Sequence, residues 1–290
     1  MISNPLEGVI TAMATVFRED GSLDLAGSAA LAEHLLANGS DGLVVGGTTG
    51  ESPTLDDSEK LALLSSILEV AGEDAPVVLG TGSNDTRHSV ELTARAAEAG
   101  ASGALVVTPY YNKPNRTGIS AHFAAVAEAA PELPIVVYNI PARVIVNIPP
   151  DHLAELASIP NVVAVKQAND DEIQPIPGLD LLAGNDSGLL DVMRNGGAGG
   201  ILVASHFAGE RMGELIDLAR ADDFQGAEEL DESLRPVYEA MSVTTNPIPV
   251  KAALEMAGIC RATMRLPMVE ATDEEKTRIA ELLAAGGVEI

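Results

Sequence analysis

Residues 43–71 read LVVGGTTGESPTLDDSEKLALLSSILEVA, and this stretch contains one complete strand–loop–helix unit. It begins with three apolar residues at 43–45, a pattern typical of a strand buried on both faces of a parallel sheet. Residues 58–71 carry leucine and isoleucine at helical spacing. Asp56 and Glu59 have the spacing of a capping box, which predicts the start of that helix.

The same alternation recurs through the first two hundred residues. Short β-rich runs are separated, for the most part, by segments with apolar residues at helical spacing. The eight runs are 9–16, 43–45, 77–79, 105–107, 135–137, 162–165, 181–182 and 201–203. Eight such units in about 210 residues fit a closed (β/α)8 TIM barrel. An open doubly wound sheet is the alternative, but no G-x-G-x-x-G turn follows the first run.

The end of the chain has a different pattern, because it contains helical periodicity only. The predicted helices there are 224–241, 249–257 and 273–285. We therefore expect an α/β protein with a barrel at 1–221 and a C-terminal helical appendage at 222–290. One barrel unit is short, since residues 167–183 must finish a strand, form a helix and begin the next strand. Pro175 and Pro177 shorten any helix there, so we expect it to be vestigial.

Composition excludes several classes of function. Seventeen basic against 43 acidic residues give a net charge of −26, which argues against nucleic acid or an anionic membrane as partner. Cys260 is the single cysteine, so neither an intrachain disulfide nor a cysteine-based metal cluster is expected. The histidines lack metal-site spacing. Without a signal peptide or an 18-residue apolar stretch, we expect a cytoplasmic protein with no metal.

Polar residues gather at the predicted carboxyl ends of the strands, where barrels of this type build their active sites. The segments concerned are GGTTGE at 46–51, TPYYNKP at 108–114, YNIPAR at 138–143 and Lys166 after the run 162–165. Three of the four tyrosines and two of the five lysines therefore fall on one rim. This clustering predicts an active site on that rim.

Lys166 is the most informative of these residues, because it ends an apolar run and its stem should be enclosed by the barrel. Burial lowers the pKa of an ammonium group and makes a neutral amine available to attack a carbonyl. The alternative is a lysine whose stem packs while its head reaches solvent or an acidic partner. The residues alone leave both interpretations open.

The other rim residues also have two interpretations. Tyr138, Tyr111 and Thr48 together can relay a proton, whereas a lone tyrosine at a strand end more often only packs. Thr48 and Thr49 could form a tight turn, or could offer hydroxyls and amides to a carboxylate. Arg143 could make a weak rim ion pair, or could hold a second carboxylate with its planar fork.

Taken in order, these motifs resemble those of the dihydrodipicolinate synthase / N-acetylneuraminate lyase family of pyruvate-dependent class I aldolases. The motifs that carry the resemblance are GTTGE at 47–51, TPYYNKP at 108–114, YNIP at 138–141 and the strand-end Lys166. The resemblance covers nearly the whole chain. Within the family, the double threonine, NPIPVK at 246–251 and RLPM at 265–268 resemble the 4-hydroxy-tetrahydrodipicolinate synthase branch.

The resemblance implies a mechanism. Lys166 would form an imine with pyruvate, and loss of a methyl proton would give an enamine nucleophile. Tyr138, Thr48 and Tyr111 would form the proton relay, with Tyr111 crossing into the neighbouring subunit's site in a homotetramer built from two tight dimers. No cofactor is implied. The implied binding residues are Thr49 and the Ile201 backbone for pyruvate, Arg143 for the carboxylate of L-aspartate 4-semialdehyde, and Gly184 and Asn185 beside that second substrate.

Two further functions stay open. One is a pyruvate-dependent aldolase or lyase acting on a 2-keto-3-deoxy sugar acid or another aldehyde; the other is a non-catalytic barrel that binds a keto acid. The chain also departs from the family pattern beside the predicted site. Gln167 replaces an acidic residue that usually follows the lysine, His206 stands at the place of an asparagine, and the segment 167–183 is short.

Inhibition by lysine is predicted to be weak or absent. In family members that show it, the effector pocket uses residues matching Pro53, Asn84, His88 and Tyr110. His88 stands here where an acidic residue would hold the effector's ammonium group. Asp57 and Lys60 also differ from the inhibited bacterial pattern.

Overall fold

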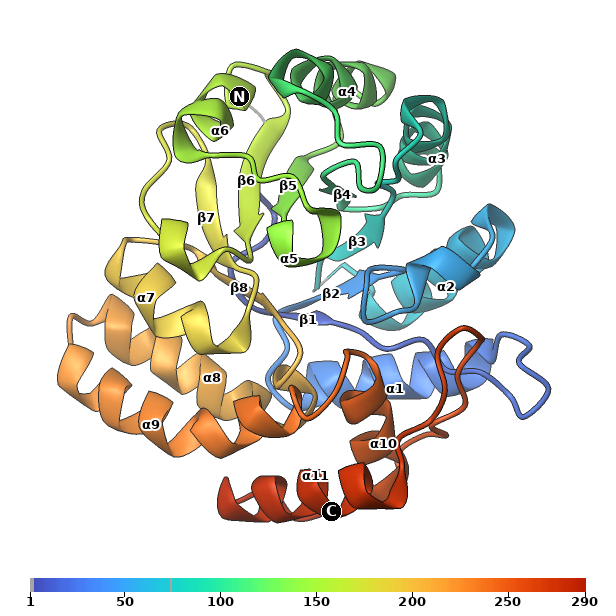
Figure 1. Cartoon of the computed structure of the whole chain (residues 1–290), viewed down its shortest axis with the longest axis vertical. Helices are drawn as coiled ribbons and strands as arrows, with labels where there is room; N and C mark the ends of the chain where they lie inside the picture. The colour runs from blue at the N-terminus through green and yellow to red at the C-terminus, as the bar shows by residue number, and fades with distance from the viewer. Residues whose placement is uncertain (1–2, 74) are drawn as a thin grey trace.

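The computed structural model describes residues 3–73 and 75–290 and contains a closed barrel of eight parallel strands (Figure 1). The strands pair in chain order, and the last pairs with the first. They are β1 (Gly8–Ala12), β2 (Gly42–Val45), β3 (Val77–Gly80), β4 (Gly103–Val107), β5 (Ile135–Asn139), β6 (Val162–Gln167), β7 (Asp180–Ala183) and β8 (Gly199–Leu202). The predicted TIM barrel is therefore confirmed.

Helices surround the strands. They are α1 (Leu25–Ala37), α2 (Asp57–Ala71), α3 (Thr86–Glu98), α4 (Arg116–Ala129), α5 (Pro141–Val144), α6 (Pro150–Leu156), α7 (Leu189–Arg194) and α8 (Ser205–Arg220). The predicted capping box is present, because the Glu59 amide donates to Asp56 at 2.8 Å and the Asp56 amide donates to Glu59 at 3.1 Å. Helix α2 begins one residue earlier than expected.

Two other expectations concern the length of elements. The first strand ends at Ala12, so the prediction of a strand over 9–16 is wrong at its end. The reason is local, because the Val16 amide donates to Ser28 and its carbonyl accepts from Asp24, which ties this stretch to the start of α1. Between β6 and β7 the chain forms the 3-10 turn η2 (Asp170–Glu172). The vestigial helix is thus confirmed.

The end of the chain forms α9 (Phe224–Ala240), α10 (Ile248–Met256) and α11 (Asp273–Ala285). In Figure 1 these orange and red helices lie beside α8 and α1, on one side of the barrel. The helical appendage is confirmed, and the division at residue 221 stays a prediction. None of the described helices is long and apolar enough to cross a membrane.

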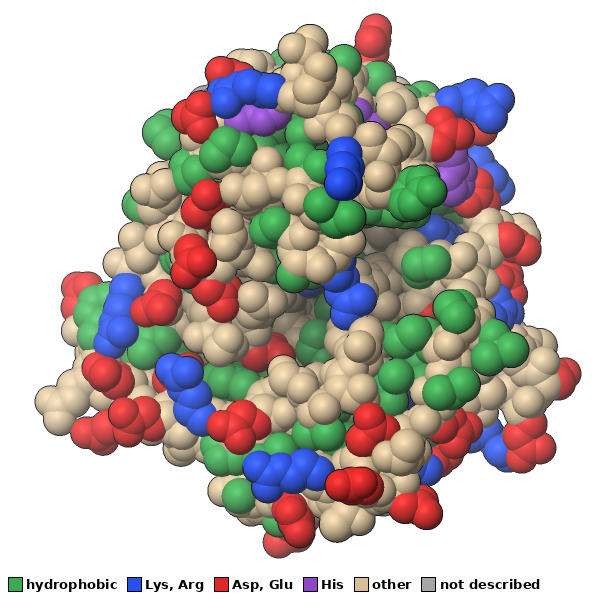
Figure 2. All heavy atoms as spheres, in the orientation of Figure 1, with side chains coloured by type: hydrophobic (Ala, Val, Ile, Leu, Met, Phe, Trp, Pro, Cys, Tyr) green, Lys and Arg blue, Asp and Glu red, His purple; other side chains and the backbone are tan. Residues whose placement is uncertain are grey.

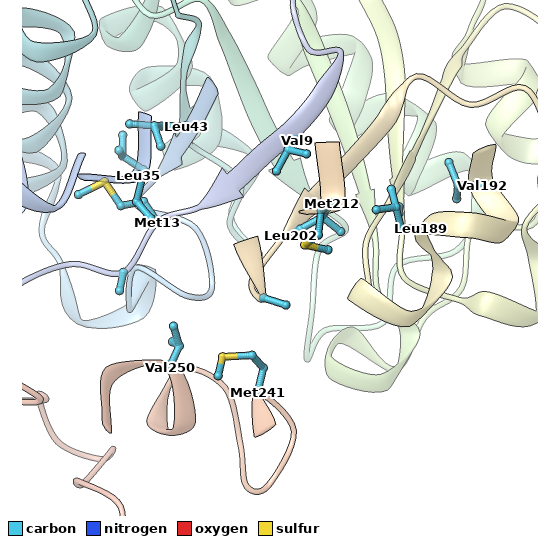
Figure 3. Close-up of a cluster of buried hydrophobic side chains, with 14 of the residues drawn as sticks. Val9, Met13, Leu35, Leu43, Leu189, Val192, Leu202, Met212, Met241 and Val250 are labelled. Atoms are coloured by element: carbon cyan, nitrogen blue, oxygen red, sulfur yellow. The ribbon is translucent and has the colours of Figure 1, made fainter. Parts of the chain in front are cut away.

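Apolar side chains form two buried clusters. One fills the barrel interior and includes Ile10, Val44 and Leu182. The other lies between the strands and the helices and continues into the appendage. Figure 3 shows Met241 and Val250 of the appendage near the barrel residues of this second cluster. Because side chains fill the interior of a barrel of this type, its active site is built at the carboxyl ends of the strands.

Candidate active site

A cavity of about 220 Å³ opens at the carboxyl ends of the strands, and we call it the lysine cavity after Lys166. Figure 2 shows this face hollowed near its centre, with basic side chains beside the hollow and acidic ones spread over the periphery. Seven of the nine predicted site residues line the cavity, namely Thr48, Thr49, Tyr138, Arg143, Lys166, Gly184 and Asn185. The rim prediction is therefore consistent with the geometry.

Lys166 and Tyr138 form the centre of the cavity. They occupy paired positions on β6 and β5, and the Lys166 Nζ lies 4.4 Å from the centroid of the Tyr138 ring. Each residue is only 5% exposed. Burial lowers the pKa of Lys166 to about 8, with Asp186 opposing the shift and Arg143 adding to it. At pH 7 about a tenth of this amine is therefore neutral and able to attack a carbonyl.

Tyr138 is positioned to move protons at the same atoms. Burial raises the pKa of its phenol, and a hydrogen bond with Thr48 partly offsets that rise. The phenol therefore stays protonated near neutral pH and can donate to an oxygen that develops charge. Thr48 comes from the loop after β2, so two of the three predicted relay residues meet within one chain.

The third predicted relay residue, Tyr111, lies away from the lysine cavity. Its side chain is 83% exposed, and its backbone has a φ of +70°, which aromatic residues rarely adopt. Lys113 in the same loop also has a positive φ, of +48°. This loop presents Tyr111 outward instead of toward the Tyr138 of its own chain.

The predicted binding residues are linked through the appendage. Thr49 is buried, and its Oγ1 accepts a hydrogen bond from the Asn246 side chain at 3.1 Å. The exposed Arg143 donates to the Asn246 carbonyl, also at 3.1 Å. Asn246 therefore joins the two groups predicted to bind the two substrate carboxylates.

The remaining predicted residues lie after β7 and on β8. The Gly184 amide donates to the Gln167 carbonyl at 2.7 Å, and Asn185 donates to Asp170 at 2.9 Å. Ile201 is fully buried in the barrel interior and does not line the cavity with its side chain. The role of its backbone stays a prediction. Among the described residues, no group of three or more His, Cys, Asp or Glu is placed to hold a metal ion.

The sequence of this chain matches the model of a protein family, the Dihydrodipicolinate synthetase family, over residues 5–286. The chain belongs to this family. A curated relative, the 4-hydroxy-tetrahydrodipicolinate synthase of Parasynechococcus marenigrum, is 46% identical over 288 residues, which cover 97% of this chain and 95% of the relative. The family named from the sequence motifs is thereby confirmed.

Solved structures of the family have the same fold. One is the crystal structure of dihydrodipicolinate synthase (DHDPS) from Cyanidioschyzon merolae with lysine bound. It matches this chain with a TM-score of 0.93 and 38% sequence identity, and the match covers 97% of this chain and 98% of the DHDPS chain. The chloride-inhibited dihydrodipicolinate synthase from Acinetobacter baumannii, complexed with pyruvate, gives 0.94 at 35% identity, over 98% of this chain and 99% of that one. Both likenesses extend over nearly the full length of each chain.

Two of the three departures from the family pattern, Gln167 and His206, lie outside the lysine cavity. Gln167 is buried, and its Oε1 accepts from Asn139 at 3.0 Å and from the Asn169 amide at 3.1 Å. His206 is within 2.8 Å of the Val203 carbonyl through Nδ1, and burial lowers its pKa to about 4. Both residues therefore serve packing and hydrogen bonding around the family's site.

Two titratable residues that line the cavity, Asp186 and Tyr238, were missed by the sequence reasoning. Asp186 directly follows Gly184 and Asn185, so its place after the seventh strand was the available signal. Tyr238 comes from the last turn of α9. It had no such signal, because the face that α9 turns toward the barrel depends on tertiary packing.

Proposed function

We propose that this member of the family is a 4-hydroxy-tetrahydrodipicolinate synthase. It condenses pyruvate with L-aspartate 4-semialdehyde on the path to diaminopimelate and lysine. The observation that carries the proposal is the buried Lys166 amine against the Tyr138 ring in a cavity that also exposes Arg143. The curated relative at 46% identity has the same printed name.

The first half of the reaction builds the nucleophile. The neutral Lys166 amine attacks C2 of pyruvate, water leaves, and an imine forms. Thr49 and the Ile201 backbone hold the pyruvate carboxylate and the imine. The imine accepts the electron pair of a methyl C–H bond, and the methyl proton leaves through Tyr138 and Thr48 to give an enamine.

The second half uses the mouth of the cavity. Arg143 binds the carboxylate of the semialdehyde, with Gly184 and Asn185 bordering this substrate. The enamine carbon attacks the aldehyde carbon, and Tyr138 protonates the new alkoxide. Attack of the substrate's own amine on C2 then closes the ring and releases Lys166.

We further propose that the active form is a cytoplasmic homotetramer of two tight dimers. The exposed Tyr111 supports this, because its loop leaves the relay of one chain incomplete. Tyr111 then completes the relay of the neighbouring subunit. The partners of the protein are thus its two substrates and further copies of the chain.

Borohydride trapping with pyruvate, followed by peptide mass mapping, tests the imine. The expected result is one reduced adduct on Lys166, and Lys166→Met is the matched control that should give none. A folded wild-type protein without an adduct would contradict the proposal. Product formation with L-aspartate 4-semialdehyde, but not with sugar-acid aldehydes, then tests the acceptor. Preference for a sugar-acid aldehyde would assign the other family activity.

A further inference from the structure

Asn246 contacts two groups of the lysine cavity, although it belongs to the appendage and not to the barrel. It lies just before α10 and lines the cavity together with Thr49 and Arg143. Its side-chain Nδ2 donates to the Thr49 Oγ1 at 3.1 Å, and its backbone carbonyl accepts from the Arg143 Nη2, also at 3.1 Å. The side chain and the backbone of this residue therefore serve different groups.

The contact with Thr49 fixes the direction of a hydrogen bond. An amide nitrogen can only donate, so the Thr49 oxygen is the acceptor in this contact. A threonine hydroxyl also has one proton of its own to donate, and Asn246 leaves that proton for another acceptor. Thr49 is 2% exposed and lines the cavity, so an acceptor bound in the cavity can receive it. A substrate carboxylate is a strong acceptor, because hydrogen bonds to charged groups are shorter and stronger than those between neutral groups.

We propose that Asn246 is a positioning residue for pyruvate, which acts through Thr49 by keeping the Thr49 hydroxyl proton directed at the pyruvate carboxylate. The inference rests on the proposed function, in which Thr49 holds that carboxylate. Asn246 need not touch pyruvate in this role. The contact with Arg143 uses the backbone carbonyl, so the hold of Arg143 on the second substrate does not depend on the Asn246 side chain.

Asn246 has another role open to it, because it carries a second polar atom. Its Oδ1 is buried and has no hydrogen-bond partner among the described residues. This oxygen could accept from the ammonium group of the second substrate. The two roles separate in the first half-reaction, because imine formation involves pyruvate alone. A positioning role changes the pyruvate concentration that this step requires, whereas a role in binding the second substrate changes only the KM of the aldehyde.

The test is the pyruvate concentration that gives half-maximal trapping on Lys166 with borohydride, measured without aldehyde. In Asn246→Asp the new carboxylate can only accept, so the Thr49 hydroxyl turns toward it and is lost to pyruvate. We expect half-saturation to need roughly 10- to 100-fold more pyruvate, with the KM of the aldehyde unchanged. Asn38→Asp is the charge-matched control, because Asn38 is exposed at the end of α1 and does not line the cavity. It should match the wild type.

Thr49→Val separates an action through Thr49 from a direct effect of the added charge. In that background the hydroxyl is gone, so Asn246→Asp should raise the half-saturating pyruvate concentration by less than it does with Thr49 present. Thr49→Ser keeps a hydroxyl and should restore the full effect. Asn246→Leu has no polar side-chain atom and should give a smaller rise, which disappears in combination with Thr49→Val. It decides the question if Asn246→Asp does not fold.

Three results would overturn the inference and leave the proposed function standing. They are unchanged half-saturation in both Asn246 variants, a rise that persists in full without the Thr49 hydroxyl, and a change confined to the KM of the aldehyde. The last of these would assign the Asn246 Oδ1 to the second substrate. No adduct on Lys166 in the wild type would overturn both the inference and the proposed function.

Discussion

Lys251 of α10 donates a hydrogen bond to the Glu51 Oε1 at 2.6 Å, and both side chains are almost fully buried between the appendage and the barrel. Glu51 ends the GTTGE segment and has a left-handed φ of +56°. Its other oxygen accepts from the Arg265 amide at 3.1 Å. The loop that carries Thr48 and Thr49 is therefore anchored by a charge from the appendage.

Lys251→Met should strongly destabilise the protein, because it leaves the Glu51 carboxylate buried without its cation. We expect a loss of about 3–5 kcal/mol in the free energy of unfolding, measured by urea denaturation. Arg261→Met is the matched control, since Arg261 pairs with Glu19 at the exposed surface and should change stability by less than about 1 kcal/mol. Equal losses in the two variants would contradict the role of the buried pair.

Tyr138→Phe should remove proton transfer and leave the packing around Lys166 intact. We expect kcat/KM to fall by roughly 10²- to 10⁴-fold, the usual range for loss of a general acid–base group. Tyr110→Phe is the control, because Tyr110 lies on the same rim but does not line the lysine cavity. A Tyr138→Phe enzyme with wild-type kcat/KM would exclude the relay.

Tyr111 should act in the site of the neighbouring subunit, so two inactive variants should complement each other. Tyr111→Phe and Lys166→Met are each expected to have little activity alone. When they are mixed and reassembled, each mixed dimer contains one site with both wild-type residues, and about a quarter of wild-type activity should return. Wild-type and Lys166→Met subunits mixed in the same way provide the reference. Mixtures of the two variants that stay inactive would place the function of Tyr111 within its own chain.

His206 should make the fold sensitive to acid. Its folded-state pKa of about 4 lies below the ordinary value of 6.5, so between these values the unfolded chain binds a proton that the folded chain does not. The contribution of His206 to the free energy of unfolding is therefore fully present above pH 6.5. It is lost as the pH falls toward 4, and the loss amounts to about 3 kcal/mol. The free energy of unfolding in urea, measured from pH 4.5 to 7 for wild type and His206→Gln, tests this contribution. If both proteins lose stability equally as the pH falls, His206 is not the cause of the acid sensitivity.

Inhibition by lysine should be weak, for a reason seen in a second cavity of about 470 Å³ beside the lysine cavity. Lys60 and His88 line it. The His88 Nε2 lies 2.8 Å from the Asp57 Oδ1, and burial lowers the pKa of Lys60. His88 therefore stands where the ammonium group of a ligand would need a carboxylate, and Asp85 is the acidic residue that lines the cavity.

A titration of activity with lysine checks this prediction, and submillimolar inhibition would refute it. His88→Glu places a carboxylate at position 88 and should increase sensitivity to lysine. His88→Gln, which changes the ring without adding charge, is its control.

The strands and the central lysine could be predicted because both depend on local sequence. A continuous apolar run predicts a strand that is buried on both faces of the sheet. A lysine at the end of such a strand lies at the carboxyl end of the barrel, where the active site is built. Asp186 and Tyr238 could not be predicted in the same way. Their place in the cavity depends on how η3 (Asp186–Gly188) and α9 pack against the strands. The end of β1 was missed for a similar reason, since contacts with α1 and not the apolar run decide it.

The contact between Asn246 and Thr49 also constrains how this chain can be divided. A chain ending at residue 221 would still contain all eight strands, yet Thr49 would lose its donor and Arg143 its acceptor. Tyr238 would also be missing from the cavity wall. The appendage therefore cannot be exchanged or lost as an independent module, and the two parts must be inherited together for the cavity to keep its shape.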